Sequence, residues 1–261
     1  VITRNPSGVL AAVGTDARSI FDTDDGRNAG IHYWLARPFA DVVTSSRLDP
    51  ESHGARHRSY PGLKAQMIFH PDNFERDPHI RQRYDLGRRR LFVARFSAYT
   101  AVHDHKAQGI SAELQSEILT RLSRNGTVLL SREGHDPRLL FQNGMESPVS
   151  PADFHQLLAN ADLFVGDSQS VAAEAAVLGI CALHMSSFSG KLFYLRYLEQ
   201  QKLMRSFDPW QERELLEAID SVMTVNRRGW ESTEEPVVAL NDLLGDPLEW
   251  YQCLIQEELS K

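Results

Sequence analysis

The sequence predicts an α/β protein with two domains and parallel sheets, and three observations lead to this fold class. Short apolar runs alternate with amphipathic segments in both halves of the chain, as strands alternate with helices. A connection that contains prolines, residues 70–78, separates the halves. Residues 162–191 read as strand, turn, helix and strand, which is a βαβ unit. We therefore assign residues 1–78 to a first domain and residues 79–261 to a second domain that ends in a closing helix.

The βαβ segment contains the first candidate ligand site. An apolar run at residues 163–165 breaks at Gly166, passes through a small polar turn and enters an alanine-rich helix at 171–178. Ser168 or Ser170 can cap the free N–H groups of that helix, and its dipole favours an anion such as phosphate. The competing interpretation is that Asp and Ser are ordinary helix caps that bind nothing.

A second polar turn favours the binding interpretation. It spans residues 187–191, includes Ser189, Gly190 and Lys191, and follows the next apolar run at 180–185. Polar turns on consecutive strands of a parallel sheet face the same edge, where open α/β sheets bind their ligands. Glu174 lies near the start of the intervening helix and is predicted to face the same rim. Lys191 is expected either to contact phosphates or to be an ordinary surface lysine.

The first domain follows the same alternation, but it is short by one or more βα units. Helices are predicted at 8–13 and 30–39, the second with Ile31, Trp34 and Leu35 at helical spacing, and strands at 17–21 and 41–44. The acidic turn after the first of these strands contains Asp24, which is a candidate general base, metal ligand or hydroxyl clamp. The alternative is an acidic cap of the next helix. The spacing does not match a calcium-binding EF-hand loop.

The remaining elements complete the second domain. Strands are predicted at 91–95 and 127–130, and helices at 111–123, 192–201, 211–222 and 247–259. The loop 96–110 is long for a βα connection and contains His103 and Asp104, and loops of this kind bind ligands or are disordered. The basic stretch 53–64 is either a loop that faces an anion or a linker, and we favour the linker.

Composition narrows the function classes. The chain has 261 residues, a formal net charge of −7 and 42% hydrophobic residues, which is typical of a soluble globular protein and argues against broad nucleic-acid binding. Its two cysteines, Cys181 and Cys253, have no metal-binding spacing and suggest no disulfide scaffold, so we expect a cytoplasmic protein. No apolar run is long enough to span a bilayer. Peripheral membrane association and a homodimer remain open, and neither a metal nor a cofactor is expected.

Four stretches together resemble a known family. They are RFSAYTAVHDHKAQGIS, SREG, SPADFHQLLANADLFVGDSQSVAAEAAVLGICAL and SSFSGKLFYLRYLE. They look like an uncharacterised bacterial and archaeal family with the GT-B architecture of two Rossmann-like domains, related to UDP-N-acetylglucosamine 2-epimerase and to glycosyltransferases that use nucleotide sugars. The resemblance covers most of residues 91–199 and is weaker in the first domain.

The resemblance implies roles for residues that match the family's motifs. Glu174 would hold the ribose, His103 would face the sugar phosphate, and Asp104 would orient His103 or bind sugar hydroxyls. The chain departs from the epimerase pattern where Asp104-His105-Lys106 replace paired arginines and where the phosphate turn lacks its two glycines, so epimerisation is in doubt. The resemblance and the two turns together give these ligand-binding candidates: Ser131, Glu133, Gly134, Gly166, Asp167, Ser168, Gln169, Ser170, Glu174, Ser189, Gly190 and Lys191.

The function predicted from the sequence is the binding of a nucleotide sugar, specifically a UDP-sugar, between the two domains. The leading reaction is glycosyl transfer for a surface polysaccharide or glycolipid, with His103, Asp104 and Asp24 as catalytic residues. One alternative is an epimerase or hydrolase that acts on UDP-sugars. The other is a non-catalytic protein that binds sugar nucleotides or serves as a scaffold.

Overall fold

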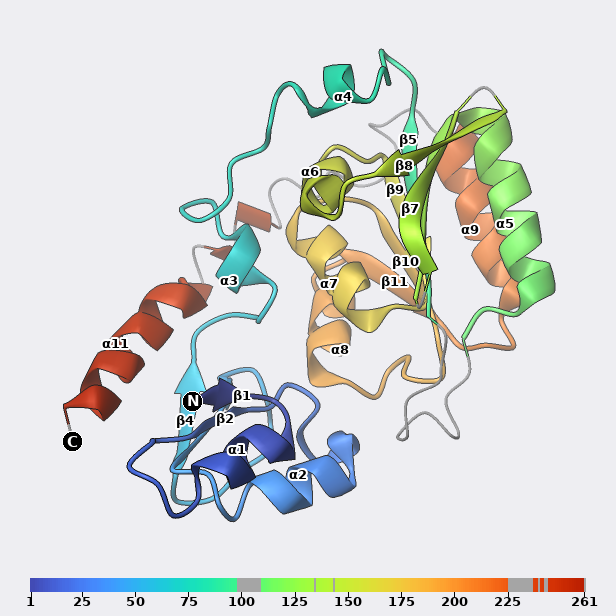
Figure 1. Ribbon diagram of the computed structural model, residues 1–261. Coiled ribbons are helices and arrows are strands. Elements are labelled where there is room, and N and C mark those ends of the chain that lie inside the picture. The colour runs from blue at the N-terminus through green and yellow to red at the C-terminus, as the bar shows by residue number, and fades with distance from the viewer. Residues whose placement is uncertain are drawn as a thin grey trace. The chain divides into compact units, whose positions relative to one another are not determined.

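The computed structural model describes residues 1–97, 109–133, 135–142, 144–224, 237–238, 240–241 and 244–260. The chain divides into two compact units (Figure 1). The first contains Val1–Asn73 and Leu240–Lys261, and the second contains Phe74–Ala239. The terminal helix, which the sequence analysis places in the second domain, is part of the first unit. No helix in the described part of the chain is long and apolar enough to cross a membrane.

The first unit contains a four-stranded parallel sheet. Its strands follow chain order: β1 (Ile2–Thr3), β2 (Ile20–Asp22), β3 (Val42–Ser46) and β4 (His57–Tyr60). Helices α1 (Pro6–Ala12) and α2 (Ile31–Ala36) and the short η1 (Gly26–Ala29) connect the first three strands. Val9 and Tyr33 from these helices pack on Phe21 and Val43 of the sheet, which forms one core of the unit.

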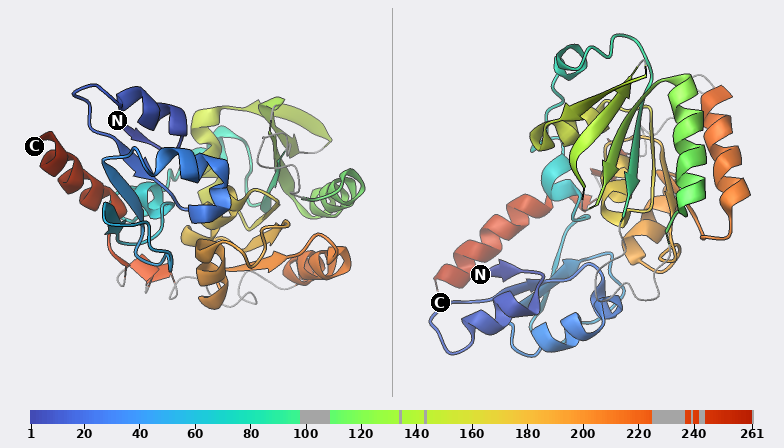
Figure 2. Two further views of the ribbon diagram at one scale, coloured as in Figure 1. Left: turned by 90° about the horizontal axis from the view of Figure 1, so that it is seen from below. Right: turned by 45° about the vertical axis from the view of Figure 1, so that its right-hand side comes forward.

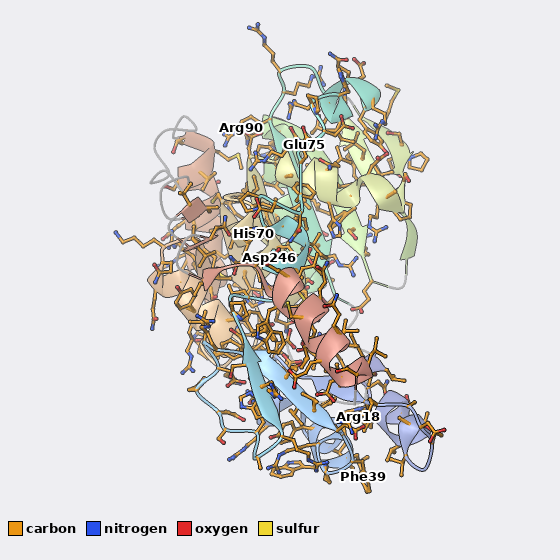
Figure 3. The ribbon with its side chains drawn as sticks, turned by 90° about the vertical axis from the view of Figure 1, so that its left-hand side faces the viewer. Arg18, Phe39, His70, Glu75, Arg90 and Asp246 are labelled. Atoms are coloured by element: carbon orange, nitrogen blue, oxygen red, sulfur yellow. The ribbon has the colours of Figure 1, made fainter. Side chains whose placement is uncertain are left out.

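The last helix, α11 (Pro247–Leu259), belongs to this unit because its residues complete a second core. Tyr251 and Leu254 pack with Ile20, Val42 and Tyr60 on the sheet. The Tyr251 hydroxyl lies 2.6 Å from Oγ1 of Thr44 and 2.8 Å from Oδ1 of Asp22. Arg18, which Figure 3 labels, donates to the buried Glu258 of α11 at 2.6 Å. The short α3 (Gln66–Phe69) lies against the same helix.

The second unit is built on a seven-stranded sheet with the order β11-β10-β9-β5-β6-β7-β8. Its first five strands in this order are mutually parallel, and β7 and β8 are antiparallel additions at one edge. The strands are β5 (Leu91–Phe96), β6 (Thr127–Arg132), β7 (His135–Gln142), β8 (Met145–Val149), β9 (Leu163–Gly166), β10 (Ala182–Met185) and β11 (Met204–Phe207).

Helices cover both faces of this sheet (Figures 1 and 2). On one face, α5 (Ala112–Asn125) and α9 (Glu212–Thr224) pack against Phe92, Val165 and Leu183 in the main core. The other face carries α6 (Phe154–Ala159), α7 (Gln169–Val177) and α8 (Phe193–Gln200). Two short helical turns, α4 (Ile80–Arg83) and η3 (Pro151–Asp153), lie in the connections. This three-layer arrangement is the α/β fold that the sequence predicts.

Three local features differ from the sequence prediction. The basic stretch 53–64, expected to be a linker, contains the strand β4. The hairpin of β7 and β8 occupies residues to which the sequence analysis assigns no strand. In α2, Ile31, Trp34 and Leu35 share one side of the helix but face solvent, while Tyr33 and Ala36 are buried.

Candidate functional site

The candidate site lies where the second unit's sheet changes the direction of its strand order. From β5 the chain crosses through α5 to β6 on one side, while β9 lies on the other side of β5 and leads through α7 to β10. The carboxyl ends of β5 and β9 therefore form a topological switch point. Open α/β sheets bind ligands outside such points.

Gly166, at the end of β9, is required by the close approach of these two strands. It pairs with Arg95 of β5, and a Cβ added to Gly166 would lie 2.2 Å from the Arg95 carbonyl oxygen. A real Cβ cannot come so close to a backbone atom. The glycine predicted as a ligand-binding residue thus has a structural reason to be there.

Asp167 follows Gly166, and its carboxylate is used inside the fold. It accepts hydrogen bonds from the backbone N–H of Ser97 at 2.6 Å and of Ile110 at 3.2 Å. Both ends of the segment that contains His103 and Asp104 are therefore attached to the end of β9. Burial raises the pKa of Asp167 to about 6, although the N–H donors lower it. Asp167 therefore stabilises the backbone around the site through these hydrogen bonds, a role that the sequence alone does not reveal.

The first polar turn opens α7. Ser168 is the residue before the helix and has extended backbone angles, but its side chain makes no capping hydrogen bond. Ser168 and Gln169 are half-buried and Ser170 is exposed. The first N–H groups of an α-helix have no partner within the helix. The turn therefore presents backbone donors and two hydroxyls at the carboxyl end of β9.

The second polar turn lies beside the first because β9 and β10 are adjacent parallel strands. Within it, the N–H of Phe188 donates to Oγ of Ser186 and the N–H of Ser189 donates to the Ser186 carbonyl. Gly190 has a φ of +65°, a conformation that favours glycine. Ser189 is half-buried, while Gly190 and Lys191 are exposed. The structure thus places both predicted turns at the same edge of the sheet.

His184 of β10 interacts with a residue next to each of the two turns, Ser186 and Asp167. It is fully buried, with Nε2 3.2 Å from Oγ of Ser186. Burial lowers its pKa to about 4, while the neighbouring backbone of Asp167 raises it. The imidazole is therefore neutral at neutral pH. No feature of the apolar run 180–185 distinguishes this histidine from an ordinary core residue.

Arg95 is the site residue that sequence reasoning missed. Its Nη1 donates to Oγ of Ser131 at 2.5 Å, and its buried Nε has no hydrogen-bond partner among the residues that the structure describes. No carboxylate in the described part of the chain lies within ion-pair distance of it. Arg95 shares a row across the sheet with Ser131, Gly166, His184 and Ser206, which are in register on neighbouring strands. A charged residue inside the apolar run 91–96 was the available signal.

Glu174 lies on α7 with its side chain 18% exposed. Its Oε2 is 3.6 Å from Nε2 of His155 on α6. Burial, and then the charge of Arg138, lower the pKa of His155, so this neighbour is uncharged at neutral pH. Glu174 is thus a partly accessible carboxylate on the helix that follows the first turn.

The other predicted residues are distributed differently. His103, Asp104 and Gly134 lie outside the described residues. Ser131 is fully buried and supports Arg95, and Glu133 is exposed with its N–H donating to the Phe96 carbonyl.

Asp24 lies in the first unit, just after β2. It forms ion pairs with Arg4 and, at 3.8 Å, with Lys64. This carboxylate is neutralised by two cations within its own unit.

Within the described ranges, no three His, Cys, Asp or Glu side chains are grouped so as to hold a metal ion. A surface hollow of about 560 Å³ lies between α5 and α9, lined in part by Arg121, Arg124 and Asp220. It is on the face of the sheet opposite α7, and none of the predicted site residues lines it.

Comparison with known proteins places this geometry in a structural context. No protein-family model matches the sequence, and no curated protein matches it. A solved protein described as a UDP-N-acetylglucosamine 2-epimerase from Listeria monocytogenes is similar, with a TM-score of 0.55 and 14% identity. The similarity covers 93% of this chain and 66% of that chain.

Two further solved structures are similar. The complex of MnaA from S. aureus with UDP has a TM-score of 0.55 and 12% identity, covering 88% of this chain and 67% of that one. The glycotransferase of kitacinnamycin has a TM-score of 0.52 and 12% identity, covering 96% and 73%. Such identities show the fold alone: this chain has the Rossmann-like α/β fold of GT-B proteins and spans about two thirds of the length of the first of these structures.

Proposed function

We propose that the second unit binds the diphosphate of a nucleotide sugar, specifically a UDP-sugar, at the switch point between β5 and β9. The whole chain would act as a glycosyltransferase of GT-B type in the synthesis of a surface polysaccharide or glycolipid. The nucleotide sugar is its substrate, and no separate cofactor is required.

The observation that carries this proposal is Arg95 of β5, which is in register with Gly166 at the end of the strand that leads into α7. A guanidinium with no carboxylate partner among the described residues and the unpaired N–H groups of a helix N-terminus are both donors that diphosphates bind. Because Ser131 fixes one side of the guanidinium, its remaining donors are held in place before a ligand arrives. In glycosyl transfer, negative charge develops on the departing diphosphate, and fixed donors stabilise that charge.

The other candidates are assigned by position along the same edge. Ser168, Gln169 and Ser170 would contact the diphosphate, and Glu174 would accept hydrogen bonds from the ribose hydroxyls. Asp167 and His184 would hold the two turns in place without contacting the ligand. His103 and Asp104 remain proposed catalytic residues from the family resemblance.

Calorimetric titration of the full chain with UDP and with UDP-sugars tests binding. We expect saturable binding of UDP that Arg95→Gln weakens, because the guanidinium provides the fixed charge. If UDP does not bind at millimolar concentration, the proposal is wrong. NMR of a UDP-sugar incubated without an acceptor separates the reactions, since only an epimerase or hydrolase changes it.

A non-catalytic binding protein is the second candidate function, and the surroundings of Asp24 favour it. A general base needs a carboxylate that is available to the substrate, whereas Arg4 and Lys64 already pair with Asp24. For this candidate, UDP-sugar binding persists while no acceptor tested yields product. Detection of product with any acceptor would exclude this candidate, and in that case Asp24→Asn tests whether Asp24 takes part in the reaction, since only then does it lower turnover.

A further inference from the structure

The solvent side of α2 carries four exposed apolar side chains. Ile31 is 65% exposed, Trp34 53%, Leu35 46% and Phe39, in the turn after the helix, 51%. The spacing of the first three, i, i+3 and i+4, places them on one side of the helix. Figure 3 shows Phe39 at the surface of this unit. We call these four residues the α2 patch.

The size of the α2 patch matches one half of a stable protein interface. A standard interface buries about 800 Å² on each partner, and about 57% of that area, or roughly 450 Å², is apolar. The four side chains together expose roughly 500 Å², to which the two aromatic rings contribute about half. The patch therefore supplies the apolar area that such an interface needs, and its polar neighbours supply the rest.

Carboxylates outnumber cations where this helical segment begins. Asp24 and Asp25 directly precede η1, and Arg4 forms an ion pair with each of them. Arg4 also lies 3.8 Å from Asp22, and Lys64 lies 3.8 Å from Asp24. The side chain of Asp25 is 42% exposed and 3.6 Å from Arg4. Because three carboxylates share two cations, this end of the segment is negative.

The other end of the segment carries an excess of positive charge. Arg37 donates from Nε to the His53 carbonyl at 2.8 Å. Arg56 donates to the carbonyls of Pro38 and Ala40, on either side of Phe39. No carboxylate in the described part of the chain is within ion-pair distance of Arg37 or Arg56. Both guanidiniums are therefore available to a carboxylate of another molecule.

Two further carboxylates beside the patch have cations of their own. Glu51 lies 3.6 Å from Arg27, and Asp41 lies 3.3 Å from Arg18. The surroundings of the patch thus contain both signs of charge, with the negative excess at the start of the segment and the positive excess at its end. A uniformly anionic or cationic partner surface matches only one of these ends.

We propose that the α2 patch is the interface of a symmetric dimer, in which α2 packs antiparallel to α2 of a second copy. In a two-fold contact the same surface serves both partners, so every contact occurs twice. The antiparallel order brings the start of each helical segment against the end of the other, where Asp25 of one copy faces Arg37 and Arg56 of the other. The two helix dipoles then also oppose each other. This proposal does not rest on the proposed function.

Sedimentation equilibrium of the full chain tests the dimer. We expect the mass of two chains at about 10 μM and above, since interfaces of this size bind with micromolar or higher affinity. Trp34→Ala should raise the dissociation constant of the dimer by at least about 30-fold, because central tryptophans dominate the energy of an interface. Trp210→Ala is the matched control: Trp210 is 78% exposed but lies in the second unit, and its loss should leave the dimer unchanged.

Charge reversal tests the antiparallel order. Asp25→Arg should raise the dissociation constant by about tenfold, because it places like charges opposite each other. Asp72→Arg makes the same charge change at a side chain that is 82% exposed and follows α3, which packs with α11 on the other face of the sheet, and it should have no effect. Adding Arg37→Glu to Asp25→Arg restores opposite charges across the contact and should recover most of the affinity, which a merely structural effect of either substitution would not do.

Several outcomes would overturn the proposal. They are a monomeric wild type at about 100 μM, well above the weakest affinity expected for such an interface, a dimer that Trp34→Ala leaves intact, or equal effects of Asp25→Arg and Asp72→Arg. A dimer that the exchange of charges fails to restore would contradict the antiparallel order. If circular dichroism shows that Trp34→Ala does not fold, Ile31→Ala tests the same patch at its most exposed residue. UDP titration of each variant is an independent measurement, so a failure of nucleotide binding is distinguishable from a failure of dimerisation.

Discussion

Arg95 of β5 donates a hydrogen bond from Nη1 to Oγ of Ser131 of the neighbouring strand β6 at 2.5 Å. On its other side, β5 pairs with β9, the strand that leads into α7. Their neighbours Phe96 and Leu130 belong to the core that packs on α5 and α9, so the alternation of side chains along a strand puts Arg95 and Ser131 on the other face of the sheet. That face carries α7 (Figure 1). Because Ser131 is fully buried, its hydroxyl is a fixed acceptor, and the guanidinium is held without a counter-charge among the described residues. The guanidinium is therefore held in position to bind an anionic ligand before that ligand is present.

Replacing Arg95 is expected to weaken nucleotide binding strongly. Arg95→Gln should raise the dissociation constant for UDP by about 10- to 100-fold, since a hydrogen bond to a charged group contributes roughly 1.5–3 kcal/mol. Ser131→Ala should have a smaller effect in the same direction, because the charge remains but is less well oriented. Calorimetric titration measures both.

The matched control is Arg124→Gln on the opposite face of the sheet, where the side chain lines the hollow between α5 and α9. It should leave UDP affinity unchanged. Equal affinities of the wild type and Arg95→Gln would remove Arg95 from the site.

Gly166 should tolerate no side chain. Its added Cβ would lie 2.2 Å from the Arg95 carbonyl oxygen, and a backbone atom in the centre of a sheet cannot move aside cheaply. We expect Gly166→Ala to lower the free energy of unfolding by about 1–3 kcal/mol, the usual cost of overpacking. Urea denaturation measures the change.

Gly190→Ala provides the comparison for Gly166→Ala. Gly190 has nothing within 4 Å of its added Cβ, so its cost arises only from the positive φ. That cost is about 1–2 kcal/mol. If Gly166→Ala leaves stability unchanged, the close approach of β5 and β9 is wrong.

The βαβ segment was predictable because its signals are local. Glycine and polar residues interrupt the apolar runs at the points where β9 ends and β10 begins, and the predicted strand, helix and strand are confirmed as β9, α7 and β10. The role of Asp167 was not predictable from the sequence. Its partners Ser97 and Ile110 are 70 and 57 residues away, and no local pattern records such hydrogen bonds.

The incorrect sequence predictions also arise from features that the local sequence does not show. β4 is a polar edge strand, His57–Tyr60, whose composition is that of a loop, and only pairing with β3 makes it a strand. The terminal helix was assigned to the wrong unit because its partners, Thr44 and Asp22, lie more than 200 residues earlier in the chain. Arg95 was overlooked since its sequence neighbours are apolar.

Asp167 should make the protein more stable as the pH falls. Its pKa is about 6 in the folded protein and 3.8 in the reference state, so the folded protein holds this proton more tightly. Its contribution to the free energy of unfolding therefore rises as the pH falls from above 6 towards 4, by roughly 3 kcal/mol. Urea titrations of the wild type and Asp167→Asn over this range measure it: the stability of the wild type relative to the variant should increase at low pH. A difference that does not change with pH would contradict the burial of this carboxylate.

His184 should have the opposite pH dependence in nearly the same range. Its pKa falls from 6.5 to about 4 on folding, so the unfolded chain takes up the proton first. Stability from neutral His184 is complete above pH 6.5 and is lost towards pH 4, by roughly 3 kcal/mol. His184→Gln should therefore be less sensitive to acid than the wild type in urea titrations, and the exposed His79→Gln should behave as the wild type does. If both variants follow the wild-type curve, His184 is not buried as described.

Tyr251→Phe should lower the stability of the first unit and leave that of the second unit unchanged. The variant loses the hydroxyl that contacts Thr44 and Asp22, and it leaves the buried Asp22 carboxylate with one donor fewer. A cost of about 1–3 kcal/mol is expected for such a loss. Because the second unit has its own core, hydrogen exchange should become faster in β2 and β3 while β9 and β10 keep their protection. Tyr197→Phe, on α8 of the second unit, is the control and should leave exchange in β2 and β3 as it is. Faster exchange in β9 and β10 of Tyr251→Phe would mean that α11 stabilises the second unit, as the sequence predicted, and that the assignment of residues 240–261 to the first unit is wrong.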